Sequence, residues 1–486
     1  MSDAEIGFSS ALELLQLMET GAVSSRELTE HYIARIETHD PALHALAARD
    51  FAAARAAADA ADAERRQGRA GPLCGLPITI KDALETKGLT TTSGAPEYKA
   101  HVPAEDADAV ARLRRAGAVI LGKSNTPYMS GDWQSFNPLT GCTNNPWDLA
   151  RTPGGSSGGA AAALAAGLSA ADIGSDIGGS IRIPAHLCGI FGHKPSHGLI
   201  STRGHIPGPP GSLTPADLSV LGPLARSAAD LKLLLNILAG PPPGDKAWSL
   251  ALPPPRAESA GKLKVAVWAD DPFSPVSAEV RDAVHTAASA FAEMGAAVDY
   301  EARPEIAFAE AQENYAILMH AVVTSGFPAK IRGALAARAS DLAEDDQSHP
   351  ALQARGAALT YAGALALKEQ QARIRAAWAA FFTRFDILLC PPANIPAFAH
   401  DHDPNFWRRR IDVDGQSRSY GDLMHWAGLA TGAHLPATAA PIGLTSKGLP
   451  VGVQIIGPHL EDMTPIAAAA MLEAAGFRYT PPPDFT

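Results

Sequence analysis

Two segments rich in serine and glycine, and a lysine upstream of them, carry side chains that could take part in nucleophilic catalysis. Arg151–Gly159 contains Gly-Gly-Ser-Ser-Gly-Gly, and Gly174–Pro184 contains Asp-Ile-Gly-Gly-Ser-Ile-Arg. Adjacent glycines let the backbone approach a ligand closely and present N–H groups to it. Lys81 ends a short β-branched run, where a side chain can be held rigidly. Nucleophilic catalysis needs a nucleophile, a base and donors for developing negative charge, and these segments offer hydroxyls, an amine and backbone N–H groups.

A phosphate-binding loop is one alternative interpretation of the sequence. Gly117–Ser124 fits the pattern G-x4-G-K-[ST], but the four residues between its glycines are Ala, Val, Ile and Leu. Such residues form a buried strand and cannot cradle phosphates. Pro127 would also interrupt the helix that must follow such a loop. We therefore expect no nucleotide site here.

A nucleophile elbow of the G-x-S-x-G type is a second alternative, at Gly154–Gly158. That elbow follows a strand directly, whereas Arg-Thr-Pro-Gly before it makes a poor strand. A Ser-His-Asp triad would also need a later histidine. His402, His425 and His434 are available, but none stands in a telling context.

A metal site is a third alternative. Four residues with metal-binding side chains cluster in the sequence: Cys188, His193, His197 and His205. The i, i+4 spacing of His193 and His197 suits a metal only on a helix, and Pro195 and Gly198 break any helix there. We expect no metal and no cofactor.

Length and composition exclude several classes of protein. The chain has 486 residues, 46% of them hydrophobic, with 40 Lys and Arg against 51 Asp and Glu, a net charge of −11. This is a globular composition without the basic balance of a nucleic-acid binder. No stretch reaches the roughly 18 apolar residues of a membrane helix, and the acidic N-terminus is no signal peptide. The four scattered cysteines are expected to be reduced, in a cytoplasmic protein.

Short β-branched runs alternate with Ala-rich helical stretches along most of the chain. The expected strands are 75–80, 118–121, 171–173, 264–268, 386–389 and 451–456. The expected helices include the first 66 residues, with one helix at 51–66, and the stretches 107–116, 277–294 and 367–384. This alternation predicts an α/β fold, a single large domain (1–486) with a central mixed β-sheet flanked by helices on both faces.

Within that domain, the sequence divides into N-terminal helices (1–70), a core that holds the motifs (71–240) and a C-terminal half (257–486). Between the last two lies a Pro-rich crossover, 241–256, which is either a linker or a surface loop.

The joint occurrence of the two Ser/Gly motifs and the strand-end lysine resembles the amidase signature family of serine hydrolases. The resemblance covers most of the chain and includes Pro441–Gly457 near the C-terminus. It implies that Ser180 is the acyl-forming nucleophile, that Ser156 relays its proton after a cis Gly155–Ser156 bond, and that neutral Lys81 is the base.

The resemblance also implies an oxyanion hole made of backbone N–H groups. Its donors would belong to Ile177, Gly178, Gly179 and Ser180. Ser157 and Arg182 are expected to support the site, with Arg182 pairing with Asp176 or donating to backbone carbonyls. Asp82 and Asp176 are expected to be structural rather than a general acid pair.

The substrate is less well defined than the machinery. The family includes the glutaminase subunit of a tRNA amidotransferase, but Ser124–Phe136 departs from that subunit's M-D-E-F-A-M-G-like run, and Asp176-Ile-Gly replaces its Asp-Thr-Gly. We therefore expect a stand-alone amidohydrolase of small apolar or aromatic substrates, including aryl acylamides, esters or carbamates. The alternatives are an amidotransferase A-type subunit that works with a partner and, more remotely, a non-catalytic relative.

Four residues are expected to border the acyl pocket: Tyr128, Met129, Ser130 and Trp133. Together with Phe136 they would make it apolar and aromatic, since the segment Tyr128–Phe136 has one acid and no Arg or Lys. The expected partner is a small-molecule amide, without nucleic acid or membrane, and the choice between a monomer and a homodimer stays open.

Overall fold

A mixed β-sheet of eight strands forms the centre of the fold, in the order β10-β9-β11-β15-β14-β7-β8-β6. The computed structural model describes residues 3–206, 208–245, 247, 249–343 and 345–486. β9 pairs in parallel with β10 and β11, and every other pair in this sheet is antiparallel. The bounds of these strands are β6 (Asp172–Asp176), β7 (Phe191–Lys194), β8 (Val220–Ala225), β9 (Lys264–Val267), β10 (Ala297–Asp299), β11 (Ile387–Cys390), β14 (Ala437–Leu444) and β15 (Pro450–Ile456).

A smaller sheet lies beside β6 and completes the scaffold of the motifs. Its order is β1-β3-β2, with bounds β1 (Leu46–Arg49), β2 (Pro77–Lys81) and β3 (Val119–Ser124). β2 is tied to the start of β6 by two backbone hydrogen bonds, Thr79 N–H to the Ala171 carbonyl (3.2 Å) and Ala170 N–H to the Pro77 carbonyl (3.1 Å). The end of β2, where Lys81 stands, is thus fixed relative to β6.

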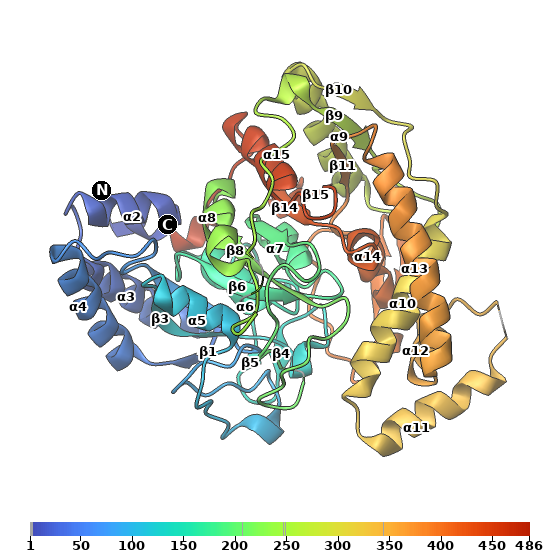
Figure 1. Ribbon diagram of the computed structural model, residues 1–486, viewed down its shortest axis with the longest axis horizontal. Helices are drawn as coiled ribbons and strands as arrows, with labels where there is room; N and C mark the ends of the chain where they lie inside the picture. Colours follow the sequence, from blue (N-terminus) through green and yellow to red (C-terminus); the bar gives the residue numbers. More distant parts are fainter. Residues whose placement is uncertain (1–2, 207, 246, 248, 344) are drawn as a thin grey trace.

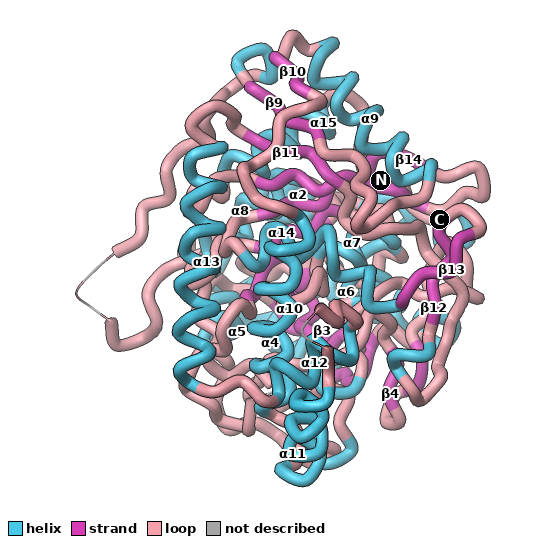
Figure 2. Tube along the Cα trace, turned by 90° about the vertical axis from the view of Figure 1, so that its right-hand side faces the viewer, coloured by secondary structure: helices cyan, strands magenta, loops and turns pink. Residues whose placement is uncertain are grey.

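Helices cover both faces of the large sheet, as the alternating sequence pattern predicts (Figure 1). α7 packs on β7, β14 and β15, whereas α8 and α15 pack on each other and on β8 and β14. α10 to α13 pack together on the right-hand side of Figure 1, the side that faces the viewer in Figure 2. The helices are α1 (Asp3–Phe8), α2 (Ala11–Glu19), α3 (Ser25–Leu43), α4 (Phe51–Arg66), α5 (Asp108–Arg115), α6 (Gly158–Ala165), α7 (Arg182–Cys188), α8 (Ala228–Leu238), α9 (Ala278–Glu293), α10 (Phe308–Ser325), α11 (Ala329–Arg338), α12 (His349–Ala357), α13 (Tyr361–Phe381), α14 (His425–Gly432) and α15 (Met463–Ala474). Short strands β4 (Phe136–Asn137), β5 (Gly141–Cys142), β12 (Arg410–Val413) and β13 (Gln416–Ser419) form two hairpins.

The N-terminal helices follow the expected pattern, with one interruption. Ser24 caps α3 in a capping box: its hydroxyl accepts from the Glu27 N–H (3.1 Å), and the Glu27 carboxylate accepts from the Ser24 N–H (2.9 Å). Helix α4 has the bounds expected from the sequence. The expectation of helix throughout the first 66 residues is wrong at β1, because Leu-Ala-Ala-Arg pairs with the edge of β3, a tertiary contact that its composition does not reveal.

The Pro-rich segment 241–256 contains neither helix nor strand where it is described, and residues 246 and 248 lie outside the described residues. Arg256, at its end, pairs with Glu461 (2.5 Å) and donates to the Phe382 carbonyl (2.5 Å). The segment is therefore fastened to α13 and the region before α15. No helix in the described part of the chain is both long and apolar enough to cross a membrane.

Gly159, in the first turn of α6, lies against neighbouring backbone. A Cβ atom there would stand 2.3 Å from the Asn125 nitrogen, 2.5 Å from the Asn125 carbonyl oxygen and 2.6 Å from the Ala45 carbonyl oxygen. Backbone atoms cannot move aside as a flexible side chain can. The last glycine of the Gly-Gly-Ser-Ser-Gly-Gly motif is therefore required for close packing of α6 on the small sheet.

We predict that Gly159→Ala lowers the free energy of unfolding by about 3 kcal/mol, the upper part of the range for overpacking. Urea unfolding followed by circular dichroism measures this. The control is Gly333→Ala in α11, where a Cβ meets nothing within 4 Å and better helix propensity should stabilise by about 0.5–1 kcal/mol. Equal unfolding midpoints for the two variants would show that α6 is not closely packed at Gly159.

Candidate active site

Lys81, at the end of β2, is surrounded by serine hydroxyls. Its side chain is fully buried, and Nζ lies 2.6 Å from Ser156 Oγ, 3.0 Å from Ser157 Oγ and 3.0 Å from Ser175 Oγ. The structure therefore brings Lys81 to Ser156, as the sequence predicts. Ser175, on β6, is a neighbour that sequence reasoning missed.

Burial is the main cause of an unusual ionisation of Lys81. Removal from water disfavours the ammonium form and lowers the pKa of Lys81 to about 7, although the negative charges of Asp176 and Asp172 oppose this shift. An amine with this pKa is neutral in a substantial fraction of molecules near pH 7. Its lone pair can then accept a proton from a hydroxyl at hydrogen-bond distance.

The loop that carries Ser156 is held by its own neighbours. The Gly155–Ser156 peptide bond is cis, as the family resemblance implies. Ser135 Oγ donates to the Gly154 carbonyl (3.0 Å) and accepts from the Gly158 N–H (3.0 Å). These bonds bracket Ser156 on both sides.

Ser180 follows the turn after β6 and is nearly buried, with 6% of its surface exposed. The Ser157 N–H donates to the Ser180 carbonyl (3.1 Å), which joins the two serine segments directly. Among the described residues, the Ser180 hydroxyl has no hydrogen-bond partner. The backbone at Ser180 is thus joined to the segment that carries Ser156, and the Ser180 hydroxyl is not engaged by any described residue.

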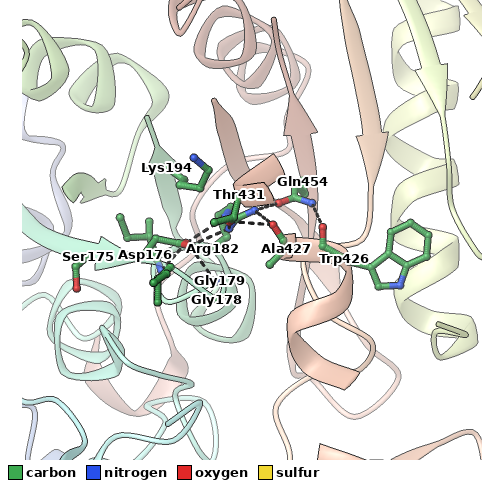
Figure 3. Close-up of polar contacts among 12 residues, drawn as sticks. Ser175, Asp176, Gly178, Gly179, Arg182, Lys194, Trp426, Ala427, Thr431 and Gln454 are labelled. Carbon is green, nitrogen blue, oxygen red and sulfur yellow. Dashed lines mark hydrogen bonds and ion pairs between the residues drawn. The ribbon is translucent and has the colours of Figure 1, made fainter. Parts of the chain in front are cut away.

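The ion pair between Asp176 and Arg182 shapes the turn between β6 and α7 (Figure 3). Asp176 accepts hydrogen bonds from the Gly179 N–H (2.9 Å) and the Ile181 N–H (3.0 Å), and both groups of the pair are fully buried. Burial alone would raise the pKa of Asp176, but Arg182 outweighs it and lowers the pKa to about 2. Asp176 is thus a charged structural residue, as expected from the sequence.

Arg182 also binds elements from the C-terminal half of the chain. It donates to the Ala427 carbonyl (2.8 Å), Thr431 Oγ1 (2.8 Å) and Gln454 Oε1 (2.5 Å), which lie on α14 and β15 (Figure 3). Both expectations for Arg182, pairing with Asp176 and donating to a carbonyl, are confirmed. The turn is therefore anchored to the opposite half of the molecule.

Two aromatic side chains orient the peptide groups of this turn. Tyr315, on α10, donates to the Ile177 carbonyl (2.7 Å), and the indole of Trp133 donates to the Gly178 carbonyl (2.8 Å). A peptide group is planar, so fixing the Ile177 carbonyl directs the Gly178 N–H to the opposite side. Tyr315 is a second residue that sequence reasoning missed, since nothing in its own segment marks it.

The expected set of oxyanion donors needs one correction. The Gly179 N–H is already bonded to Asp176, so it is not open to a substrate. In the described part of the chain, the N–H groups of Ile177, Gly178 and Ser180 have no such bond. These three remain the candidates for an oxyanion site.

The four residues expected at an acyl pocket have different surroundings. Trp133 is 8% exposed and contacts the turn, as described above. Tyr128 is 50% exposed, and its hydroxyl donates to Glu97 (2.8 Å) rather than to the serine segments. Met129 and Ser130 are partly exposed, with φ of 50° and 54°. The pocket remains a prediction, with Trp133 as its best-placed member.

The alternative motifs have ordinary structural explanations. Val119–Ser124 forms the buried strand β3 rather than a phosphate loop, and residues 152–157 before α6 form coil and bends. Asp82 accepts from the Thr92 N–H (3.1 Å) and is structural, as expected. The histidines that cluster in the sequence have different partners in the structure. His193 contacts Thr438 and Asp462, whereas His197 stacks on His434.

The sequence profile of the Amidase family matches residues 27–464. The chain therefore belongs to the amidase signature family, and its fold is the one that these enzymes share. Members of this family act on carbon–nitrogen bonds, so the protein is an enzyme of that class.

Individual relatives differ in what they do. The glutamyl-tRNA(Gln) amidotransferase A subunit of Synechococcus sp. (strain CC9902) is 35% identical, over 95% of each chain. The solved structure of 6-aminohexanoate cyclic dimer hydrolase is 28% identical, with a TM-score of 0.79 over 99% of each chain. A bacterial aryl acylamidase of the same family is 26% identical, with a TM-score of 0.79 over 96% of each chain.

We predict that Asp176→Asn lowers the free energy of unfolding by about 3–5 kcal/mol, because it leaves Arg182 as an unpaired buried charge. The pKa of Asp176 is lowered to about 2 in the folded protein. The stability that its charged form contributes is therefore complete above the ordinary Asp pKa of 3.8 and is lost as pH falls towards 2. Urea midpoints of both proteins between pH 7 and pH 3 test this. Glu64→Gln, which removes an exposed ion pair with Arg69, is the control and should leave the midpoint unchanged. A wild-type midpoint for Asp176→Asn at pH 7 would contradict the role given to this pair.

Proposed function

We propose that the protein hydrolyses carboxylic amides through an acyl-enzyme on Ser180. The observation that carries the proposal is the buried Lys81 amine, with a pKa of about 7, at 2.6 Å from Ser156 Oγ. A buried lysine that is neutral in much of the population, beside a serine hydroxyl, is the arrangement that a base requires. Membership of the amidase family supports the same reaction.

In the proposed reaction, the Ser180 hydroxyl attacks the amide carbonyl while its proton passes to Ser156. Ser156 in turn gives its own proton to neutral Lys81. As the tetrahedral species collapses, the C–N bond breaks, the amine leaves with a proton returned along the same relay, and the acyl group stays on Ser180. Water then attacks the ester by the same relay, which releases the acid and restores the enzyme.

The developing oxyanion would be bound by backbone N–H groups of the turn after β6. Gly178 is the best-supported donor, because Tyr315 fixes the peptide group to which its N–H belongs. The N–H groups of Ile177 and Ser180 are the other candidates. A single donor of this kind is typically worth about 2.7–4 kcal/mol in the transition state.

Two substrate classes are supported by different observations. The curated relatives favour a glutaminase that works with a partner as part of an amidotransferase, and they support it better than the stand-alone hydrolase. The solved hydrolases of aryl acylamides and of a cyclic amide support the stand-alone enzyme.

The surroundings of Trp133 bear on this choice. Asp132, the one acid of this segment, is bound by Arg409 (2.5 Å) and by the Tyr420 hydroxyl (2.6 Å). Trp133 itself packs against Tyr420 and Phe406. Free glutamine carries a carboxylate and an ammonium group, and either would have to compete with an existing buried pair. An uncharged acyl group would avoid this competition, which is why we favour the apolar substrate.

We predict an acid limb in the pH profile of kcat that belongs to Lys81. Because the base must be neutral, activity is full above a pKa of about 7 and falls as pH drops through it. Lys81→Ala should lose both the rate and the limb. Lys194 is a matched control, since burial also lowers its pKa to about 7 while its Nζ donates to the Pro195 carbonyl (2.8 Å) and to no serine hydroxyl among the described residues. Lys194→Met should keep the acid limb. If the limb disappeared in Lys194→Met but stayed in Lys81→Ala, the base would be Lys194 and not Lys81.

We predict that the chain alone hydrolyses acyl anilides with a larger kcat/KM than it shows for glutamine. Each methylene added to the acyl chain should gain about 0.8 kcal/mol until the pocket is full. The measurement is kcat/KM for a series from acetyl to hexanoyl anilide, beside glutamine, with Ser180→Ala as the blank for each substrate. Efficient release of ammonia from glutamine with no anilide hydrolysis would favour the role in an amidotransferase. Turnover of any substrate by Ser180→Ala would overturn the nucleophile itself.

A further inference from the structure

Cys142, His400 and His402 bring three metal-ligating atoms together outside the serine–lysine group. Cys142 lies on β5, and the two histidines lie on the loop after β11. Cys142 Sγ is 3.4 Å from His400 Nδ1 and 3.6 Å from His402 Nε2. All three ligand atoms lie within 4.8 Å of one another.

These separations match the edges of a tetrahedral zinc site. Zinc binds thiolate sulfur at about 2.3 Å and imidazole nitrogen at about 2.0–2.1 Å, which places tetrahedral S and N ligands about 3.5 Å apart. The two observed S···N distances, 3.4 and 3.6 Å, lie on either side of that value. A thiolate with two imidazoles is also a ligand set that zinc accepts readily.

The neighbours of the histidines hold them in an orientation that suits a metal. His400 Nε2 is 3.1 Å from Asn144 Oδ1. With the amide oxygen as acceptor, the ring proton sits on Nε2 and the Nδ1 lone pair faces Cys142, an arrangement common around metal-bound histidine. The His402 ring stacks on Phe136 with 4.0 Å between centroids.

The loop between the two histidines is also fixed. The Asp401 N–H donates to Gln134 Oε1 (2.9 Å), and Gln134 Nε2 donates to the Asp401 carbonyl (2.7 Å). Gln134 follows Trp133, whose indole holds the Gly178 carbonyl. The cluster is therefore attached to the segment that borders the candidate active site.

We propose that Cys142, His400 and His402 bind one Zn2+ ion, with a fourth position open to water because His402 is exposed. The ion would join β5 to the loop after β11, beside Gln134. On binding, the S–H bond of Cys142 breaks, one proton leaves, and a Zn–S bond forms without any redox change. This departs from the expectation of no metal, which rested on the sequence cluster around His193.

The test is metal binding by the untagged, metal-free full chain. We expect wild-type protein to take up one equivalent of Zn2+ in calorimetric titration. Co2+ as a probe should give a thiolate charge-transfer band and the visible bands of tetrahedral cobalt. Cys142→Ser and His400→Ala should each weaken Zn2+ binding at least tenfold, and Asn144→Ala about 10- to 100-fold through its hold on His400. His285→Ala, an exposed histidine on α9, is the control and should bind as wild type does.

A second readout uses wild-type protein, so it does not depend on the folding of variants. One equivalent of Zn2+ should slow alkylation of Cys142 by iodoacetamide at least tenfold, as measured by mass spectrometry of the peptide that contains it. No uptake of zinc, or equal affinity in Cys142→Ser and wild type, would overturn the proposal. Unchanged alkylation of Cys142 in zinc would also overturn it.

Discussion

The buried ion pair between Asp176 and Arg182 is the interaction on which the rest of the site depends. Asp176 accepts from two N–H groups of the turn that leads to Ser180, so the carboxylate sets the course of the backbone there. Arg182 carries the same constraint to α14 and β15. Because a buried pair repays its desolvation only with good geometry and further hydrogen bonds, this network fixes one conformation of the turn more than it adds stability.

At Lys81, burial acts on the pKa of the side chain. The same loss of water that makes an unpaired ammonium costly also lowers its pKa to about 7, which a base near neutral pH needs. Asp172 and Asp176 oppose this shift, so the ionisation of Lys81 depends on carboxylates that β6 places nearby. Scaffold and reactivity are thus linked through one strand: β6 carries Ser175 towards the amine and Asp176 towards the turn.

Part of this arrangement could be predicted from the sequence because its signal is local: the pairing of Arg182 with Asp176 and the bounds of α4 depend on neighbouring residues. The contact between Lys81 and Ser156 is not local, since 75 positions separate them, and it was implied by the family resemblance. β7 and β14 were missed because Gly-His-Lys and Pro-Ile-Gly lack the β-branched texture of the other strands, and only pairing within the sheet makes them strands. Ser175 and Tyr315 were missed for a similar reason: the placement of β2 beside β6 and the packing of α10 decide what they touch.

The central claim is that Ser180 forms the covalent intermediate while Ser156 only relays a proton. It is tested most directly by reaction with a serine-directed fluorophosphonate, followed by digestion and mass spectrometry of the labelled peptide. The account predicts one adduct on Ser180, formed more slowly in Ser156→Ala. An adduct on Ser156 in the wild-type protein, with Ser180 unmodified, would contradict it.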